Sequence, residues 1–149
     1  MATAPLTNPY LGYWFSVNVP KIGTTAFAEA TLSSISVGTT SYREGPDSAS
    51  LRTLPGLISY GNVTLRKGLT DSLDIYNWVQ SVLLTGMKAR QSMSISVIDG
   101  SSSSSKILAN WNFSDVLPIS YETSGLDARS TSVILEGLVL DIGGMERTK

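Results

Sequence analysis

The chain has 149 residues, with 11 basic and 12 acidic residues and a formal net charge of −1. A chain of this length can bury a core as one domain, and its near-neutral charge provides no field that attracts nucleic acid or an acidic membrane. It contains no cysteine and no histidine, which excludes disulfides, thiol chemistry, Cys/His metal sites and imidazole catalysis. No apolar run approaches the roughly 20 residues of a membrane span.

Charged residues make up only 15% of the chain, below the roughly 25% of an average soluble domain. A low density of surface charge suits a protein that covers much of its surface with copies of itself. Composition therefore favours, without requiring, a self-assembling protein.

The N-terminal third predicts strands. Residues 1–11 are expected to form a mobile N-terminal arm. The aromatic and β-branched residues 12–19 predict a strand, and residues 21–25 a turn. Residues 27–37 predict one long strand with a bulge or bend, because the apolar period slips between Leu32 and Ile35.

Residues 45–60 are predicted to form an extended loop. Turn-forming residues from Tyr42 to Asp47 lead into this loop. Pro55 and Gly56 within it argue against a regular helix. The leucines in this segment have to pack either on the parent domain or on a partner.

Residues 62–67 alternate as a strand with Val63 and Leu65 on one face. A helix follows, which Thr70 or Asp71 can cap and which Gly86 can end. Its apolar residues recur at helical spacing and are expected to pack on the sheet. They are Ile75, Trp78, Val79, Val82 and Leu83.

The C-terminal half predicts four more strands. Residues 92–98 and 107–113 form a hairpin around the serine run Ser101–Ser105. Residues 116–121 contain Pro118, which favours a sheet edge or a bulge. A polar loop over residues 123–130, the strand 132–142 and a short polar tail complete the chain. About seven strands and one helix predict a mainly β fold, a barrel or sandwich with one flanking helix, as a single domain over residues 1–149.

Chemistry-bearing patterns are few. Asp71 and Asp74 resemble a carboxylate pair, but two acids at a helix start are more simply explained by the helix dipole. The sequence has no phosphate-binding glycine motif. No catalytic, metal-binding or cofactor-binding residue is therefore predicted. Trp14, Trp78 and Trp111 can stack on sugars, although core or interface positions are more usual for such residues.

The central stretch resembles the tail tube proteins of contractile phages and phage-derived contractile injection systems, the T4-like tube family. The resemblance extends over most of the chain and is specific in its centre. Its motifs are Tyr42-Arg43-Glu44-Gly45 with Asp47, Arg52-Thr53-Leu54-Pro55-Gly56-Leu57, Tyr60 to Gly68, Asp71 to Trp78, the opening Asn8-Pro9-Tyr10 with Phe15-Ser16-Val17, and the late Trp111-Asn112-Phe113 with Pro118 to Glu122.

The resemblance implies a tail-tube (Hcp-like) β-barrel that forms hexameric rings and stacks them into a hollow tube inside a contractile sheath. Its implied partners are copies of itself, the sheath protein, baseplate or initiator tube proteins, and cargo or DNA in the lumen. It implies no enzyme activity, no cofactor and no stable membrane insertion, with assembly in the bacterial cytoplasm into a virion tail or an injection particle.

The expected assembly residues follow from the resemblance together with the residue pattern. The loop over residues 45–60 and its approach are expected to stack ring on ring, through Arg43, Glu44, Asp47, Arg52, Leu54, Pro55 and Leu57. The mobile arm over residues 1–11 is a second candidate for stacking. Serines such as Ser34 and Ser36 are expected in the lumen wall. The polar side of the helix, with Tyr76, Asn77 and Gln80, is a candidate sheath contact.

Three other functions remain open from the sequence. A monomeric β-sandwich carbohydrate-binding module would use exposed tryptophans. An enzyme is disfavoured because its usual site residues are missing. The tube-like protein of type VI secretion shares the architecture, but the capped helix and the Leu54-Pro55-Gly56 segment favour the phage-type family.

Overall fold

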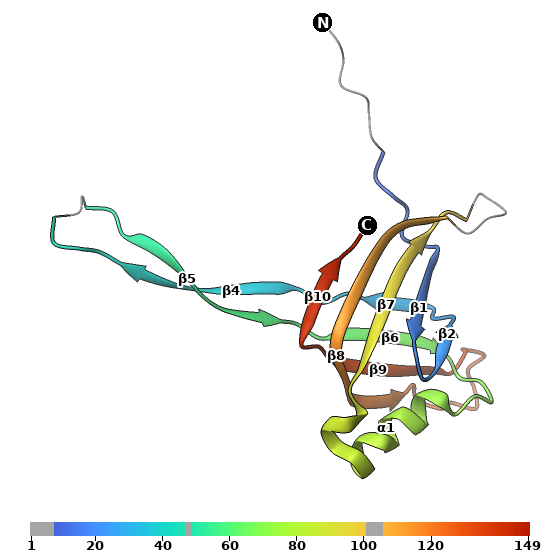
Figure 1. Cartoon of the computed structure of the whole chain (residues 1–149). Helices are drawn as coiled ribbons and strands as arrows, with labels where there is room; N and C mark the ends of the chain where they lie inside the picture. Colours follow the sequence, from blue (N-terminus) through green and yellow to red (C-terminus); the bar gives the residue numbers. More distant parts are fainter. Residues whose placement is uncertain (1–7, 47–48, 101–105) are drawn as a thin grey trace, which may run out of the picture.

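A computed structural model describes residues 8–46, 49–100 and 106–149. This part of the chain forms ten strands, one α-helix and one short 3-10 helix (Figure 1). The strands are β1 (Phe15–Val19), β2 (Gly23–Thr25), β3 (Glu29–Thr31), β4 (Ile35–Tyr42), β5 (Arg52–Tyr60), β6 (Val63–Gly68), β7 (Gln91–Ile98), β8 (Ile107–Thr123), β9 (Leu135–Asp141) and β10 (Gly144–Arg147). The helices are α1 (Asp74–Thr85) and η1 (Gly86–Ala89). The mainly β fold with one helix is confirmed.

The main sheet has eight antiparallel strands in the order β2-β1-β7-β8-β9-β6-β3, and β10 also pairs with β8. Strand β8 joins its two halves. Its first part pairs with β7 and β10, and its second part pairs with β9. The chain turns between these parts at Asp115, which has a φ of 53°. As a result, β6 and β9 cross behind β1 and β7 in Figure 1.

The core fills the space between the crossing halves. Alternate residues of β6, Val63 and Leu65, are fully buried, and so are Met93 and Ile95 of β7. These positions follow the predicted period of two, because successive side chains of a strand point to opposite faces. The rest of the buried core is Val17, Val19, Phe113, Val116, Leu138, Leu140 and Ile142 with Ile75 and Trp78 of α1. We call this folded part, without β4 and β5, the body.

Three of the predicted assignments are wrong in the N-terminal half. The turn expected over residues 21–25 contains strand β2. The single strand expected over residues 27–37 is two strands, β3 and β4, which separate where the apolar period slips. The extended loop expected over residues 45–60 is also wrong, because β5 occupies most of it and pairs with β4. Pro55 and Gly56 remain compatible with a strand because a bulge forms beside them, between Val37 and Thr39 on the partner strand.

Two further corrections concern the C-terminal half. The strands expected over residues 107–113 and 116–121 are one strand, since β8 continues through Asp115. The expected polar tail contains β10, which pairs with β8. The register of β8 against β9 shifts between Pro118 and Ser120, so the predicted bulge near Pro118 is confirmed.

Helix α1 packs on the body with one face. Ile75 and Trp78 are buried, Val79 packs against the core, and the Trp78 indole donates a hydrogen bond to the Ala89 carbonyl at 3.0 Å. Leu83, expected on the same face, is instead 77% exposed, because the last turn of the helix extends past the sheet (Figure 1).

The helix ends also differ in part from expectation. Neither Thr70 nor Asp71 caps it: the N-cap is Leu73, which makes no side-chain cap hydrogen bond. The nearby Ser72 hydroxyl instead bonds the Asp74 carboxylate at 2.8 Å. Gly86 does end the helix, with a φ of 56° that favours glycine. No helix of the described residues is long and apolar enough to cross a membrane.

Candidate assembly surfaces

Strands β4 and β5 form a hairpin that leaves the body and pairs with no other strand of the described residues (Figure 1). We call it the hairpin arm (residues 35–60). Every residue of β4 is exposed, and every residue of β5 except Tyr60. At about 3.4 Å per residue, nine residues extend roughly 30 Å. An isolated two-stranded hairpin is marginally stable in water, so the arm has the properties of an element that is completed by a partner.

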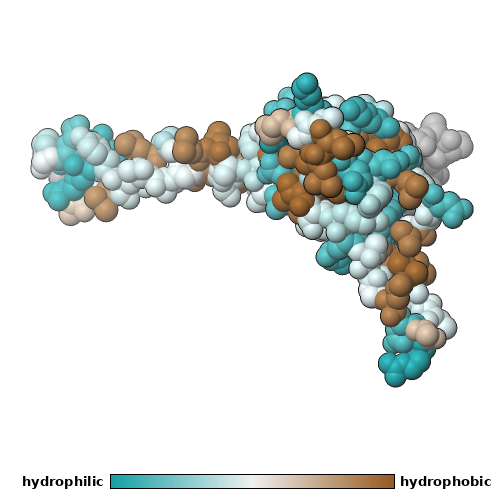
Figure 2. All heavy atoms as spheres, turned by 90° about the horizontal axis from the view of Figure 1, so that it is seen from below, coloured by the Kyte–Doolittle hydropathy of each residue, from teal (hydrophilic) through white to brown (hydrophobic). Residues whose placement is uncertain are grey.

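The hairpin arm carries apolar side chains that its own chain does not cover. Ile35 lies opposite Tyr60, and Val37 lies opposite Ile58, so these four share one face. Leu57 beside the bulge is 89% exposed. Figure 2 shows apolar residues along the shaft and hydrophilic residues at the tip.

The root of the arm is fixed by a short hydrogen-bonded crossing. The Gly61 amide donates to the Ser34 carbonyl at 2.9 Å, and the Ser33 hydroxyl donates to the Gly61 carbonyl at 2.6 Å. A Cβ on Gly61 would lie 2.8 Å from the Ser34 hydroxyl. Glycine therefore lets the two segments approach closely here, at the point where the arm leaves the body.

The predicted stacking residues lie on or near this arm. Arg43 and Glu44 follow β4, and the Arg52 guanidinium lies 3.7 Å from the Glu44 carboxylate, with both side chains about half exposed. Leu54, Pro55 and Leu57 lie on β5. The remaining predicted residue, Asp47, lies outside the described residues. The structure thus brings six of the seven onto one projecting element, as strand residues and tip residues rather than as an extended loop.

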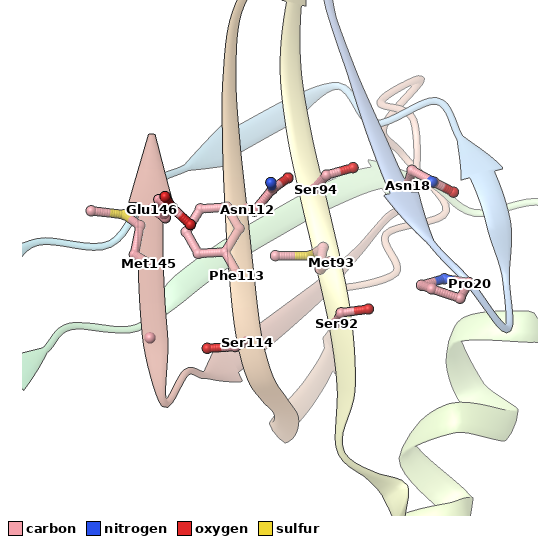
Figure 3. Close-up of a pocket in the computed structure, with 11 residues that line it drawn as sticks. Asn18, Pro20, Ser92, Met93, Ser94, Asn112, Phe113, Ser114, Met145 and Glu146 are labelled. Carbon is pink, nitrogen blue, oxygen red and sulfur yellow. The ribbon is translucent and has the colours of Figure 1, made fainter. Parts of the chain in front are cut away.

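A second surface is the side of β1, β7, β8 and β10 that faces away from the core (Figure 3). The register places Asn18 opposite Ser94, Ser94 opposite Asn112, and Asn112 opposite Glu146. We call this surface the polar face. Its members are Ser16, Asn18, Ser92, Ser94, Ser96, Asn110, Asn112, Ser114, Glu146 and Thr148. Among these side chains only Glu146 is charged, whereas roughly a third of a typical protein surface is charged.

The polar face is held by side-chain hydrogen bonds and is slightly hollowed. The Asn110 amide donates to Thr148 at 2.7 Å and to Asn112 at 3.0 Å, and Ser96 donates to Asn110 at 2.7 Å. A groove of about 590 Å³ runs along it. Short neutral side chains tied to one another make a surface with little to hold a passing molecule. The serines at alternate positions of residues 92–98 indicated a polar side, but their neighbours on other strands were not predictable.

The lumen position expected for Ser34 and Ser36 stays a prediction, and the structure places both residues at the hairpin arm. Ser36 is on β4 of the hairpin arm, paired with Ser59, and Ser34 is at the arm's root. Neither belongs to the polar face. Their assignment depended on residue type alone, since the arm was not recognised.

The outer side of α1 is a third exposed surface. The Gln80 amide donates to the Tyr76 hydroxyl at 2.9 Å. The Tyr76 ring meets the Tyr121 ring edge to face, 5.8 Å between centroids. Tyr76 and Asn77 are exposed and Gln80 is half-buried. Figure 2 shows an apolar patch on the underside of the body. Leu83 and Leu84 near the end of α1 and Met87 of η1 are exposed apolar residues.

A buried ion pair joins strands β6 and β9 of the sheet. Lys67 of β6 lies opposite Glu136 of β9, and the Nζ–Oε1 distance is 3.4 Å. Both side chains are almost fully buried. The Tyr121 hydroxyl donates to the other Glu136 oxygen at 2.8 Å. Burial, and then the bond to Glu136 and its negative charge, raise the pKa of Tyr121 to about 12. Lys67, Glu136 and Tyr121 thus link strands β6, β9 and β8. The ring contact between Tyr121 and Tyr76 connects them to α1.

The described residues offer no evident metal or sugar site. They contain no group of three acidic, histidine or cysteine residues that could hold a metal ion. Trp78 is buried, and Trp111 lies under the Arg147 guanidinium, 5.7 Å from its ring centroid. Trp14 is 51% exposed beside Tyr13. The three tryptophans therefore do not form a shared stacking platform.

Comparison with protein families gives a match over most of the chain. The model described as the T4-like virus tail tube protein gp19 matches residues 11–146, which is nearly the whole chain. A search of curated protein sequences gives no significant match. Neither comparison supports a carbohydrate-binding module.

Solved structures with the same fold include components of contractile particles. One is the sheath-tube complex of PVC, an extracellular contractile injection system, in its extended state. Its chain has a TM-score of 0.82 and 25% identity, with 94% of this chain and 91% of that chain covered. A second is the cap that terminates the anti-feeding prophage tube, with a TM-score of 0.85, 22% identity and coverages of 99% and 96%. Hcp1 from Flavobacterium johnsoniae is more distant, with a TM-score of 0.57, 14% identity and coverages of 91% and 95%.

Proposed function

This chain belongs to the T4-like virus tail tube protein gp19 family, and from that premise we propose that it closes into hexameric rings that stack into the inner tube of a contractile tail or injection particle. It is a structural protein in this proposal, with no catalytic residue, and its principal partner is another copy of itself. The observation that carries the proposal is the hairpin arm, which exposes both faces and, within the part of the chain that the structure describes, pairs only within itself.

The sheet edges support ring closure. Strands β2 and β3 lie at the two ends of the sheet order, and no strand of the described residues pairs with their outer sides. Open sheet edges tend to pair with other chains. Joining unlike surfaces of identical subunits gives a closed ring when the rotation closes, and repeating the ring along an axis gives an open filament.

The polar face supports a lumen wall. Its short neutral side chains can contact a passing molecule without strong charge attraction, and Glu146 repels polyanions rather than binding them. We propose that cargo or DNA passes along this face. The outer side of α1, with Tyr76, Asn77 and Gln80, is then a candidate contact for the contractile sheath. Similar solved structures include a sheath-tube complex and a baseplate.

Electron microscopy of the purified protein over a concentration series tests the assembly. We expect rings of uniform diameter and stacked hollow tubes. The Leu54→Asp variant is expected to remain folded and to lose tube growth, because a charge on the arm opposes burial at the contact. Leu126→Asp is the matched control, since Leu126 is 81% exposed in a loop of the body. Tubes that form equally well with Leu54→Asp would contradict the stacking role of the arm. A monomer at every concentration that shows saccharide-dependent tryptophan fluorescence would contradict the function itself.

The lumen assignment has its own test. Asn112→Arg and Asn112→Asp are both expected to assemble, because the polar face makes no subunit contact in the proposal. Only the arginine tubes are expected to retain an added oligonucleotide, which can be measured after washing. Loss of tubes with both variants would place the polar face in a subunit interface instead.

A further inference from the structure

The body has an apolar groove at one end that the described residues leave unfilled. The groove has a volume of about 490 Å³. Phe15, Ile95 and Trp111 line it from the β1-β7-β8 side, and Leu32 lines it from the opposite side. We call it the end groove. For scale, a buried apolar cavity of about 150 Å³ binds benzene, so the end groove has room for several apolar side chains.

The two ends of the body differ in how they are closed. At the end where β7 begins, α1 covers the core with Ile75 and Trp78. At the other end of β7, the end groove is bordered by Tyr10 and Leu11, which are themselves 58% and 67% exposed. Apolar surface that stays in contact with water is unfavourable by about 25 cal/mol per Å². The open end is therefore a surface that gains stability from an apolar partner.

The hairpin arm is the complementary element of the same chain. Ile58 and Leu57 are 60% and 89% exposed on it, although they are among its most apolar residues. Figures 1 and 2 show the arm extending away from its own body, so it does not fill its own groove. We propose that the arm of one copy inserts its apolar residues, with Leu57 at the contact, into the end groove of a second copy.

This docking rests on the proposed tube function and specifies where the arm binds. It joins unlike surfaces, an arm and a groove, so each docked copy still presents a free arm or a free groove. Such heterologous contacts continue without closing, which is the geometry of a growing filament. Among the described residues, Arg147 is the one charged residue that lines the end groove, and its guanidinium lies over the Trp111 ring. Arg147 is exposed to water, and the rest of this groove lining is uncharged.

Cysteine cross-linking tests the docking directly, because the chain contains no cysteine of its own. Leu57→Cys and Leu11→Cys proteins carrying tags of different size are mixed, assembled and mildly oxidised. A disulfide forms only when the two Cα atoms approach within about 4.4–6.8 Å. We expect a reducible heterodimer in the tube fraction. Leu126→Cys replaces Leu11→Cys in the control, and no heterodimer is expected with it.

A second variant tests the groove without altering the arm. Ala30 borders the end groove and is half-buried, and Ala30→Phe is expected to fill it and reduce tube mass at least tenfold, with an unchanged circular dichroism spectrum. Tubes in which Leu57→Cys does not link to Leu11→Cys, or links to Leu126→Cys, would overturn the docking and leave the tube function standing. Absence of any assembly by the unmodified protein would contradict both.

Discussion

The body and the hairpin arm are built from the same kinds of residue but are stabilised differently. Ile95 in the body is 1% exposed and Ile58 in the arm is 60% exposed. The body contains a buried ion pair, Lys67–Glu136, and the arm an exposed one, Arg52–Glu44. The body buries most of its apolar strand residues within one chain, whereas both faces of the arm stay exposed. The difference indicates that the body depends on its apolar residues for folding and that the arm does not.

The two ion pairs give the largest expected contrast. Glu136→Ala leaves Lys67 buried without its partner and is expected to lower the free energy of unfolding by about 3–5 kcal/mol. Glu44→Ala in the arm is expected to change it by about 0–1 kcal/mol, because exposed pairs are screened by water. Urea unfolding of both variants measures the difference.

A double variant separates loss of the pair from loss of packing. Lys67→Met with Glu136→Leu removes both charges and is expected to recover much of the lost stability, since an apolar pair carries no desolvation penalty. Equal destabilisation by Glu136→Ala and Glu44→Ala would show that the buried charges are solvated in solution.

The matched isoleucines give the next contrast. Ile95→Ala is expected to lower the free energy of unfolding by about 2–5 kcal/mol through lost burial and a cavity. The same substitution at Ile58 is expected to stay within about 0.5 kcal/mol while reducing tube formation. Thermal unfolding and electron microscopy on both variants distinguish folding from assembly. A large destabilisation by Ile58→Ala would show that the arm folds back on its own body.

The junction between the two regions is expected to be intermediate. Gly61→Ala brings a methyl group against the Ser34 hydroxyl at the arm's root and is expected to cost about 1–3 kcal/mol by overpacking. Gly45→Ala is the control, because no atom lies within 4 Å of a Cβ at Gly45. Tubes with altered helical parameters for Gly61→Ala alone would show that this root sets the direction of the arm.

The smallest expected effect is on one tyrosine. The pKa of Tyr121 is raised to about 12 by burial and by Glu136, above the usual value of about 10. Folding thus favours the neutral phenol of Tyr121. Its contribution to the free energy of unfolding is complete below pH 10 and is lost as the pH rises from 10 to 12.

An absorbance titration of tyrosinate measures this shift. One of the six tyrosines is expected to titrate late, and Glu136→Gln is expected to bring it closer to the others. A titration in which all six ionise together would contradict the hydrogen bond between Tyr121 and Glu136.

Prediction from the sequence succeeded where a segment buries one face in its own chain. The alternation of Val63 and Leu65, and of Met93 and Ile95, appears in the structure as buried positions of β6 and β7. The arm gave no such signal, because both faces of β4 and β5 are exposed in the isolated chain. Pro55 and Gly56 then favoured a loop over a strand.

The buried pair and the polar face were missed for a different reason. Lys67 and Glu136 are 69 residues apart in the sequence, and no local pattern pairs them. Leu83 was misplaced because helical spacing alone does not show where the sheet beneath a helix ends. The polar face depends on the register of four strands, of which β10 was not predicted.

The sequence by itself determined the mainly β class, the single helix, the absence of cysteine and histidine chemistry, and a resemblance that the family match confirms. Only the tertiary structure decided that β8 continues through two halves of one sheet, that the central segment is a projecting hairpin, and that one end of the body is open. The physical reason is that local periodicity records burial within a segment, whereas strand register, close approach and unfilled space arise from residues distant in the chain.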